Sequence, residues 1–137
     1  MGEPNLHDLF AGSGVLGFEA ASRGASKVIM VERDSIAYAA LQQTSQTLGG
    51  ASVHLIKQDA FLFLKKTSGI YDFVFLDPPF ADNCLPQLLE NLVEHTHNTS
   101  LVYFESGDKF SPASDWEFFR NDRAGKVHYG LLTRSKK

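Results

Sequence analysis

The chain has 137 residues, of which 43% are hydrophobic and 21% are charged. This composition is typical of a globular protein rather than a disordered one, and the length predicts a single domain spanning residues 1–137. The formal net charge of −3 argues against a basic surface over the whole molecule, and therefore against broad wrapping of nucleic acid. A local basic patch remains compatible with this charge.

Three features predict a cytoplasmic protein that has no membrane partner. With one cysteine, Cys84, no internal disulfide can form, which fits a reducing compartment. The first ten residues, MGEPNLHDLF, lack the basic start and apolar core of a signal peptide. No apolar run approaches the roughly 20 residues that are needed to cross a bilayer.

Short apolar runs alternate with helix-like stretches along the chain. This alternation predicts a doubly wound α/β fold with a mostly parallel, Rossmann-like sheet. The run at residues 71–77 has no polar alternation, which is typical of a central parallel strand covered on both faces. In chain order, we expect strands at residues 5–10, 27–32, 52–57, 71–77 and 100–105, and helices at residues 15–24, 34–48, 60–66 and 84–96.

The C-terminal segment, residues 115–134, predicts an antiparallel hairpin at the sheet edge, with its turn around residues 124–125. We expect Trp116, Phe118 and Phe119 to form the apolar face of this hairpin, the alternative being that an exposed ring there stacks on RNA. Six of the 13 basic residues follow Trp116, so this end of the chain is either a solvated face or a face toward RNA. They are Arg120, Arg123, Lys126, Arg134, Lys136 and Lys137.

A glycine loop joins the first strand to the first helix. Gly12, Gly14 and Gly17 have the spacing of a nucleotide-binding turn, in which glycines accept positive φ and let a ligand approach the backbone. Glu32 ends the next strand, where an acid can accept hydrogen bonds from both ribose hydroxyls. This pattern suits a dinucleotide dehydrogenase as well as an S-adenosylmethionine enzyme, and a merely tight strand-to-helix turn is the structural alternative.

Two further acids favour S-adenosylmethionine. Asp8 precedes the loop, where a carboxylate would pair with the amino acid end of that cofactor and would repel a pyrophosphate. Alternatively, Asp8 has only a structural role and caps the turn. Asp59 ends the third strand, where it can accept from the adenine amine and can also cap the following helix.

The sequence Asp77-Pro78-Pro79-Phe80 follows the fourth strand. In a doubly wound sheet this strand lies beside the first, so the motif faces the same crevice as the glycine loop. Prolines leave nearby carbonyls able to accept, Asp77 adds a carboxylate, and Phe80 adds a flat face. These features suit a planar base with an exocyclic amine, which Asp77 would align for direct methyl transfer and help to deprotonate. Otherwise the prolines merely end the strand and Phe80 packs in the core.

This motif matches the [DNS]-P-P-[YFW] pattern of amino methyltransferases. More closely, DLFAGSGVLGFEAASRGASKVIMVERD, YDFVFLDPPF, LVYFE and AGKVHYGLL resemble the RsmD-like 16S ribosomal RNA guanine-N2 methyltransferases, over nearly the whole chain. The resemblance implies a class I S-adenosylmethionine-dependent methyltransferase fold and a target-base site at residues 77–80. It also implies a cofactor site at Asp8, Phe10, Gly12, Ser13, Gly14, Glu32, Arg33, Asp59 and Ala60.

The substrate implied by the resemblance is a flipped guanine in 16S ribosomal RNA, either naked or in a small-subunit assembly intermediate. We also expect the protein to be a monomer. Members of this family usually carry some tens of residues before the first motif, whereas this chain begins almost at its first strand. A cofactor-binding core without turnover is therefore one alternative, and an amino methyltransferase for adenine in DNA or RNA is another. A nicotinamide enzyme is the last. The five histidines form no ligand set, so we expect no metal.

Overall fold

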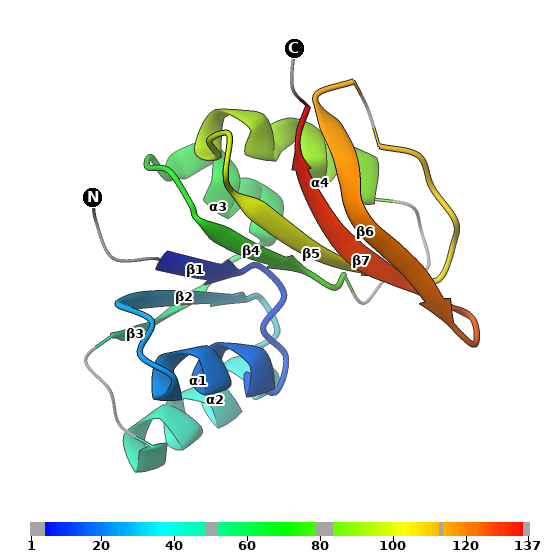
Figure 1. Cartoon of the computed structure of the whole chain (residues 1–137). Helices are drawn as coiled ribbons and strands as arrows, with labels where there is room; N and C mark the ends of the chain where they lie inside the picture. Colours follow the sequence, from blue (N-terminus) through cyan, green and yellow to red (C-terminus); the bar gives the residue numbers. More distant parts are fainter. Residues whose placement is uncertain (1–4, 49–51, 79–83, 113, 136–137) are drawn as a thin grey trace.

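The computed structural model describes residues 5–48, 52–78, 84–112 and 114–135, and it contains one seven-stranded sheet with the order β3-β2-β1-β4-β5-β7-β6 (Figure 1). The strands are β1 (Asn5–Asp8), β2 (Lys27–Glu32), β3 (Val53–Lys57), β4 (Phe73–Leu76), β5 (Leu101–Ser106), β6 (Trp116–Ala124) and β7 (Val127–Arg134). The helices are α1 (Val15–Ser22), α2 (Ser35–Leu48), α3 (Ala60–Lys66), α4 (Leu85–Leu92) and the short 3-10 helix η1 (Val93–His95).

Strands β1 to β5 run parallel, and the strand order reverses between β1 and β4. The register pairs Leu6 with Phe73 and Asp8 with Phe75, so the carboxyl ends of these two strands lie side by side. In an open parallel sheet this reversal is where ligands bind. The predicted doubly wound fold is confirmed, and so is the expectation that the fourth strand lies beside the first.

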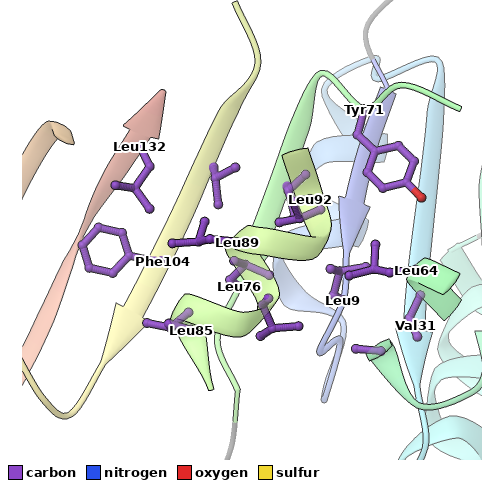
Figure 2. Packing of buried hydrophobic residues seen from close by; sticks show 14 of the residues in the cluster. Leu9, Val31, Leu64, Tyr71, Leu76, Leu85, Leu89, Leu92, Phe104 and Leu132 are labelled. Carbon is purple, nitrogen blue, oxygen red and sulfur yellow. The ribbon is translucent and has the colours of Figure 1, made fainter. Parts of the chain in front are cut away.

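Helices cover the sheet from both sides. Helices α1 and α2 lie against β1, β2 and β3, while α3 and α4 lie on the opposite face (Figure 1). The apolar residues of α4 recur at helical spacing and bury Leu85, Leu89 and Leu92 against β4, β5 and β7 (Figure 2). Full burial of one such side chain contributes about 1.5–3 kcal/mol, which fixes α4 and thereby the strands beneath it.

Most predicted elements agree with the structure to within a few residues; the first strand ends at Asp8 instead of residue 10, and the first helix at Ser22 instead of residue 24. Two further ends differ for local reasons. The fourth strand begins at Phe73 instead of residue 71, because the N–H groups of Tyr71 and Asp72 donate to the His95 carbonyl at 2.6 Å and to Asn5 Oδ1 at 3.0 Å, and not to the backbone of a neighbouring strand. The fourth helix ends at Leu92 instead of residue 96. The Thr96 hydroxyl donates to the Leu92 carbonyl at 2.9 Å and occupies an acceptor at the helix end.

The C-terminal hairpin forms as predicted, and β7 inserts between β5 and β6, so that β6 is the edge strand. Trp116 is buried, and its indole Nε1 donates to the Leu89 carbonyl at 2.9 Å. Phe118 packs against Phe104 of the core. The prediction for Phe119 was wrong: the residue is 60% exposed, since it follows Phe118, which faces the core, and successive side chains of a strand point to opposite faces.

Within the described residues, no helix combines the length and the apolar character that crossing a membrane requires.

The turn between β1 and α1 needs two of its glycines for different reasons. Gly12 has φ +54° and Gly14 has φ +82°, a region that other residues rarely adopt. A methyl group on Gly14 would also meet the side chains of Phe18 and Leu41, at 2.6 and 2.5 Å, whereas one on Gly12 would meet no atom within 4 Å. Gly14 therefore carries both a backbone and a packing requirement, and Gly12 carries only the first.

We expect Gly14→Ala to lower the free energy of unfolding by about 2–4 kcal/mol, since backbone strain and overpacking add. Gly12→Ala, the matched control, should lower it by about 1 kcal/mol through strain alone. Urea denaturation of both variants measures the difference. Equal losses for the two variants would contradict the packing requirement at Gly14.

Candidate active site

A pocket of about 260 Å³ opens where β1 to β4 end at the carboxyl edge of the sheet. Its lining combines apolar side chains with four acids. This mixture suits a nucleoside, which presents a flat base and a polar ribose. The lining residues are Leu9, Phe10, Val31, Glu32, Arg33, Asp34, Gln58, Asp59, Ala60, Phe61 and Asp77.

Glu32 fixes the glycine turn to the end of β2. Its Oε1 accepts from the backbone N–H of Gly12 at 2.8 Å, and its Oε2 accepts from the N–H of Asp34 at 3.0 Å. The Ala11 N–H also donates to the Val31 carbonyl at 3.0 Å, so the turn is held at two points. Each carboxylate oxygen can accept a second hydrogen bond, and Glu32 is therefore oriented and still able to bind two hydroxyls.

Asp59 has the capping role that the sequence predicted. Its Oδ2 accepts from the N–H groups of Phe61 at 3.0 Å and Leu62 at 3.2 Å, which starts α3. Its Oδ1 lies 3.6 Å from Arg33 Nη1, in a pair whose Arg33 side chain is 58% exposed. Such an exposed pair contributes little to stability, but it places a cation at the rim of the pocket.

Asp8 is a buried carboxyl group at the end of β1, with 3% of its surface exposed. Burial raises its pKa from the ordinary 3.8 to about 7. The Phe10 N–H, which donates to Oδ1 at 3.3 Å, partly opposes this rise, while the charges of Asp77 and Glu32 add to it. Near neutral pH, Asp8 is therefore close to its pKa, and a nearby cation would favour the carboxylate over the neutral acid.

Asp77 follows β4 and lines the pocket beside the end of β1. Although the residue is exposed, partial desolvation of its carboxyl group raises the pKa, and the charge of Glu105 raises it further. Glu105 in turn accepts from the Tyr103 hydroxyl at 2.9 Å. Pro78 follows, half-buried, whereas the predicted site residues Pro79 and Phe80 lie outside the described residues.

The structure gathers most of the predicted site residues that it describes. Phe10, Glu32, Arg33, Asp59, Ala60 and Asp77 line the pocket together. The other predicted residues are not among the lining residues: the turn residues Gly12, Ser13 and Gly14, the buried Asp8, and Pro78.

Sequence reasoning missed several lining residues and the neighbours of Asp77. Three of these lining residues are direct sequence neighbours of predicted site residues: Asp34, Gln58 and Phe61. Their position just after β2 and β3 could have predicted that they line the pocket. Glu105 and Tyr103 belong to a fifth strand whose placement beside β4 depends on the sheet order. No local motif marks them. Among the described residues, no group of three or more histidines, cysteines or acids could hold a metal ion.

Comparison with known proteins identifies the family. Residues 2–133 match the model of the family described as Conserved hypothetical protein 95. The chain belongs to this family. Relatives with the name Ribosomal RNA small subunit methyltransferase D include that of Haemophilus influenzae, 38% identical over 133 residues, which are 90% of this chain and 68% of the relative. The protein of Escherichia coli is 34% identical over 134 residues, 93% of this chain and 67% of the relative.

The chain thus spans about two thirds of the length of these relatives. The resemblance to the RsmD-like methyltransferases is confirmed by these matches.

Solved structures give the same assignment. The protein yhhF of Escherichia coli, assigned as a methyltransferase, superposes with a TM-score of 0.89 at 29% identity, covering 98% of this chain and 79% of that one. An assigned methylase of Haemophilus influenzae has a TM-score of 0.86 at 33% identity, with 98% of this chain and 88% of the other covered. The fold of this family member is therefore that of the class I S-adenosylmethionine-dependent methyltransferases, as predicted.

The raised pKa of Asp8 makes the stability of the family member depend on pH. The folded protein keeps the Asp8 proton up to about pH 7, whereas the unfolded chain loses it near 3.8, so stability falls as the pH rises through this window. At about 1.4 kcal/mol for each pH unit, the loss reaches about 4 kcal/mol above pH 7.

Asp8→Asn keeps the acceptor for Phe10 and removes the titration. We expect the variant to be increasingly more stable than the wild type as the pH is raised from 5 to 8. Chemical denaturation at each pH measures the difference. A difference that stays constant over this range would contradict the buried, high-pKa state of Asp8.

Proposed function

We propose that this chain is a methyltransferase domain that transfers a methyl group from S-adenosylmethionine to the exocyclic N2 amine of a guanine in small-subunit ribosomal RNA. One observation carries this proposal: with β1 and β4 paired, the carboxyl group of Asp77 lines a nucleoside-sized pocket at the carboxyl ends of the strands. The names of the relatives supply the substrate class.

The residues of the pocket fit the cofactor. Glu32 would accept from the two ribose hydroxyls, and Asp59 from the adenine amine, while Leu9, Val31 and Phe61 supply apolar surface for the base. Asp8 would pair with the α-ammonium group, since a cation there restores the charged form that burial disfavours. A methyltransferase with this fold, 14% identical, has been solved with the demethylated product, SAH, bound to it.

Asp77 performs the chemistry that the protein itself must supply. When bound, S-adenosylmethionine presents an electrophilic methyl group. The amine of a base is a weak nucleophile, because its lone pair is conjugated into the ring. Asp77 accepts a hydrogen bond from the amine, orients its lone pair and takes the proton that is released. The raised pKa of Asp77 makes its carboxylate a stronger proton acceptor than an ordinary aspartate.

The C-terminal hairpin supports an RNA substrate. Because β7 runs antiparallel to β5, its first residues pair with the end of β5: His128 with Ser106 and Tyr129 with Glu105. The hairpin turn therefore extends beyond the edge of the sheet that holds Asp77. Arg123 and Lys126 are exposed there, where they can contact phosphates that flank the target base. This favours the RNA-facing interpretation of the basic C-terminal segment.

The deciding experiment titrates the 137-residue chain with S-adenosylmethionine, its demethylated product and NAD in a calorimeter. Transfer of tritiated methyl groups to 16S ribosomal RNA, immature small subunits and DNA is then measured, and the modified nucleotide is mapped. Binding of the first two ligands and labelling of RNA are expected. Binding of NAD alone would contradict the proposal, labelling of DNA would indicate the adenine alternative, and cofactor binding without any transfer would indicate an inactive core.

We further propose a monomeric, single-domain protein that acts in the cytoplasm, where ribosomal subunits are assembled.

Substitutions at the two ends of the site should separate catalysis from cofactor binding. Asp77→Ala removes the proton acceptor, so we expect kcat to fall by about 10²–10⁴-fold with cofactor Kd nearly unchanged. Glu32→Ala removes the ribose acceptors and should weaken cofactor binding by about 10–100-fold. Calorimetry and single-turnover transfer assays measure both. Normal binding and turnover in both variants would mean that the site lies elsewhere.

Replacement of the hairpin cations tests the RNA surface. The double variant Arg123→Ala/Lys126→Ala should bind 16S ribosomal RNA more weakly, and the slope of log affinity against log salt should decrease by about 2. The matched control is Lys65→Ala/Lys66→Ala, which removes two exposed cations from the end of α3 instead. Filter binding at several salt concentrations measures the slopes. The same slope change in both variants would show that only net charge is sensed.

A further inference from the structure

A second carboxylate stands next to Asp77 and has no part in the chemistry assigned so far. Strands β4 and β5 are parallel, with Phe75 opposite Tyr103 and Leu76 opposite Phe104. Continuing this register by one residue places Asp77 beside Glu105. Neighbouring strands are about 4.8 Å apart, and residues in register point to the same face of a sheet. The charge of Glu105 raises the pKa of Asp77, which is consistent with this proximity.

Glu105 has one tyrosine as its hydrogen-bond donor and another as its register partner on the next strand. The Tyr103 hydroxyl donates to Glu105 Oε2 at 2.9 Å, and Tyr129 of β7 is the register partner of Glu105. The ring of Tyr103 packs edge-on against Phe75, with centroids 6.0 Å apart and an interplanar angle of 82°. Burial raises the pKa of Tyr103 to about 12, helped by Glu105, so its hydroxyl remains a hydrogen-bond donor. Glu105 is therefore an oriented, half-buried acceptor with capacity left for a ligand.

A pair of neighbouring carboxylates is selective for one kind of base edge. The Watson–Crick edge of guanine carries two adjacent donors, N1–H and the N2 amine. Adenine offers one amine beside N1, which is an acceptor and would face a carboxylate lone pair unfavourably. Two carboxylates that accept from both guanine donors would leave one acceptor unpaired when adenine is bound. This loss discriminates strongly between the two bases.

We propose that Glu105 is a base-recognition residue that accepts from guanine N1–H while Asp77 accepts from the N2 amine, so that the pair selects guanine over adenine. The inference rests on the proposed function and specifies its substrate. Tyr103 is a positioning residue, which acts by holding Glu105 through the hydroxyl bond. Asp77 then performs the proton transfer, and Glu105 decides which base is presented to it.

The test uses 2-aminopurine, which keeps the amine at position 2 but has an acceptor in place of N1–H. Once the modified nucleotide has been mapped, RNA stem-loops are made with guanine or 2-aminopurine at that position. We expect the wild-type chain to prefer guanine by at least about 10-fold in kcat/KM. In Glu105→Gln the amide can donate to the acceptor, so the preference should shrink by about 10-fold or more, with cofactor affinity unchanged.

Two further variants make the result specific. Tyr103→Phe should shrink the preference by a smaller factor, about 3-fold, through looser positioning of Glu105. Glu117→Gln, an exposed carboxyl group on β6, makes the same change in net charge and should leave the preference unchanged. If Glu105→Gln fails to fold, as judged by lost cofactor binding, Tyr103→Phe decides the question.

An unchanged guanine preference in Glu105→Gln would overturn the role of Glu105, while transfer by the wild type would leave the proposed function intact. Absence of transfer by the wild type to any RNA would overturn the proposed function and the role of Glu105 with it. The two failures are therefore distinguishable.

Discussion

The parallel pairing of β1 with β4 is the constraint on which the site depends. These strands are more than 60 residues apart in sequence, yet Leu6 to Asp8 lie in register with Phe73 to Phe75. The pairing is supported by the apolar cover of α4 and by the buried residues of both strands. Since it is also where the strand order reverses, no helix connection passes over the edge at this point, and a ligand can enter. Asp8 and Asp77, one on each side of the reversal, become neighbours only through this pairing.

The electrostatics of the crevice follow from this arrangement. Asp8, Glu32 and Asp77 end three different strands, and the charges of the latter two raise the pKa of Asp8 on top of its burial. Such a concentration of acid disfavours an anionic ligand such as a pyrophosphate and favours a cationic one. A sulfonium compound with an ammonium group relieves the repulsion. The distinction between the two cofactor classes, which the glycine loop leaves open, thus rests on the acids around the loop.

How far the sequence predicted the site depends on whether the signal is local. The glycine turn, Glu32 and the capping acid Asp59 depend on residues close in sequence and on the strand that precedes them, so periodicity and spacing were sufficient. The buried state of Asp8, the register shift next to Phe119, and the position of Glu105 near Asp77 depend on the packing of distant strands. No pattern within one segment encodes those. Fold-level reasoning recovered the β1–β4 pairing because the alternation of strands and helices restricts the topology.

The coupling between Asp8 and Asp77 joins the two halves of the proposed reaction. The charge of Asp77 adds to the rise that burial causes in the pKa of Asp8. A cation held at Asp8 would favour its carboxylate form over the neutral form. At Asp77, desolvation raises the pKa, and the charge of Glu105 raises it further. Under the proposed function, the cofactor-binding ends of β1 to β3 and the acceptor acids of β4 and β5 therefore meet across the reversal. The cofactor would act on the crevice from one side, and the proposed base-reading acid Glu105 would act on Asp77 from the other.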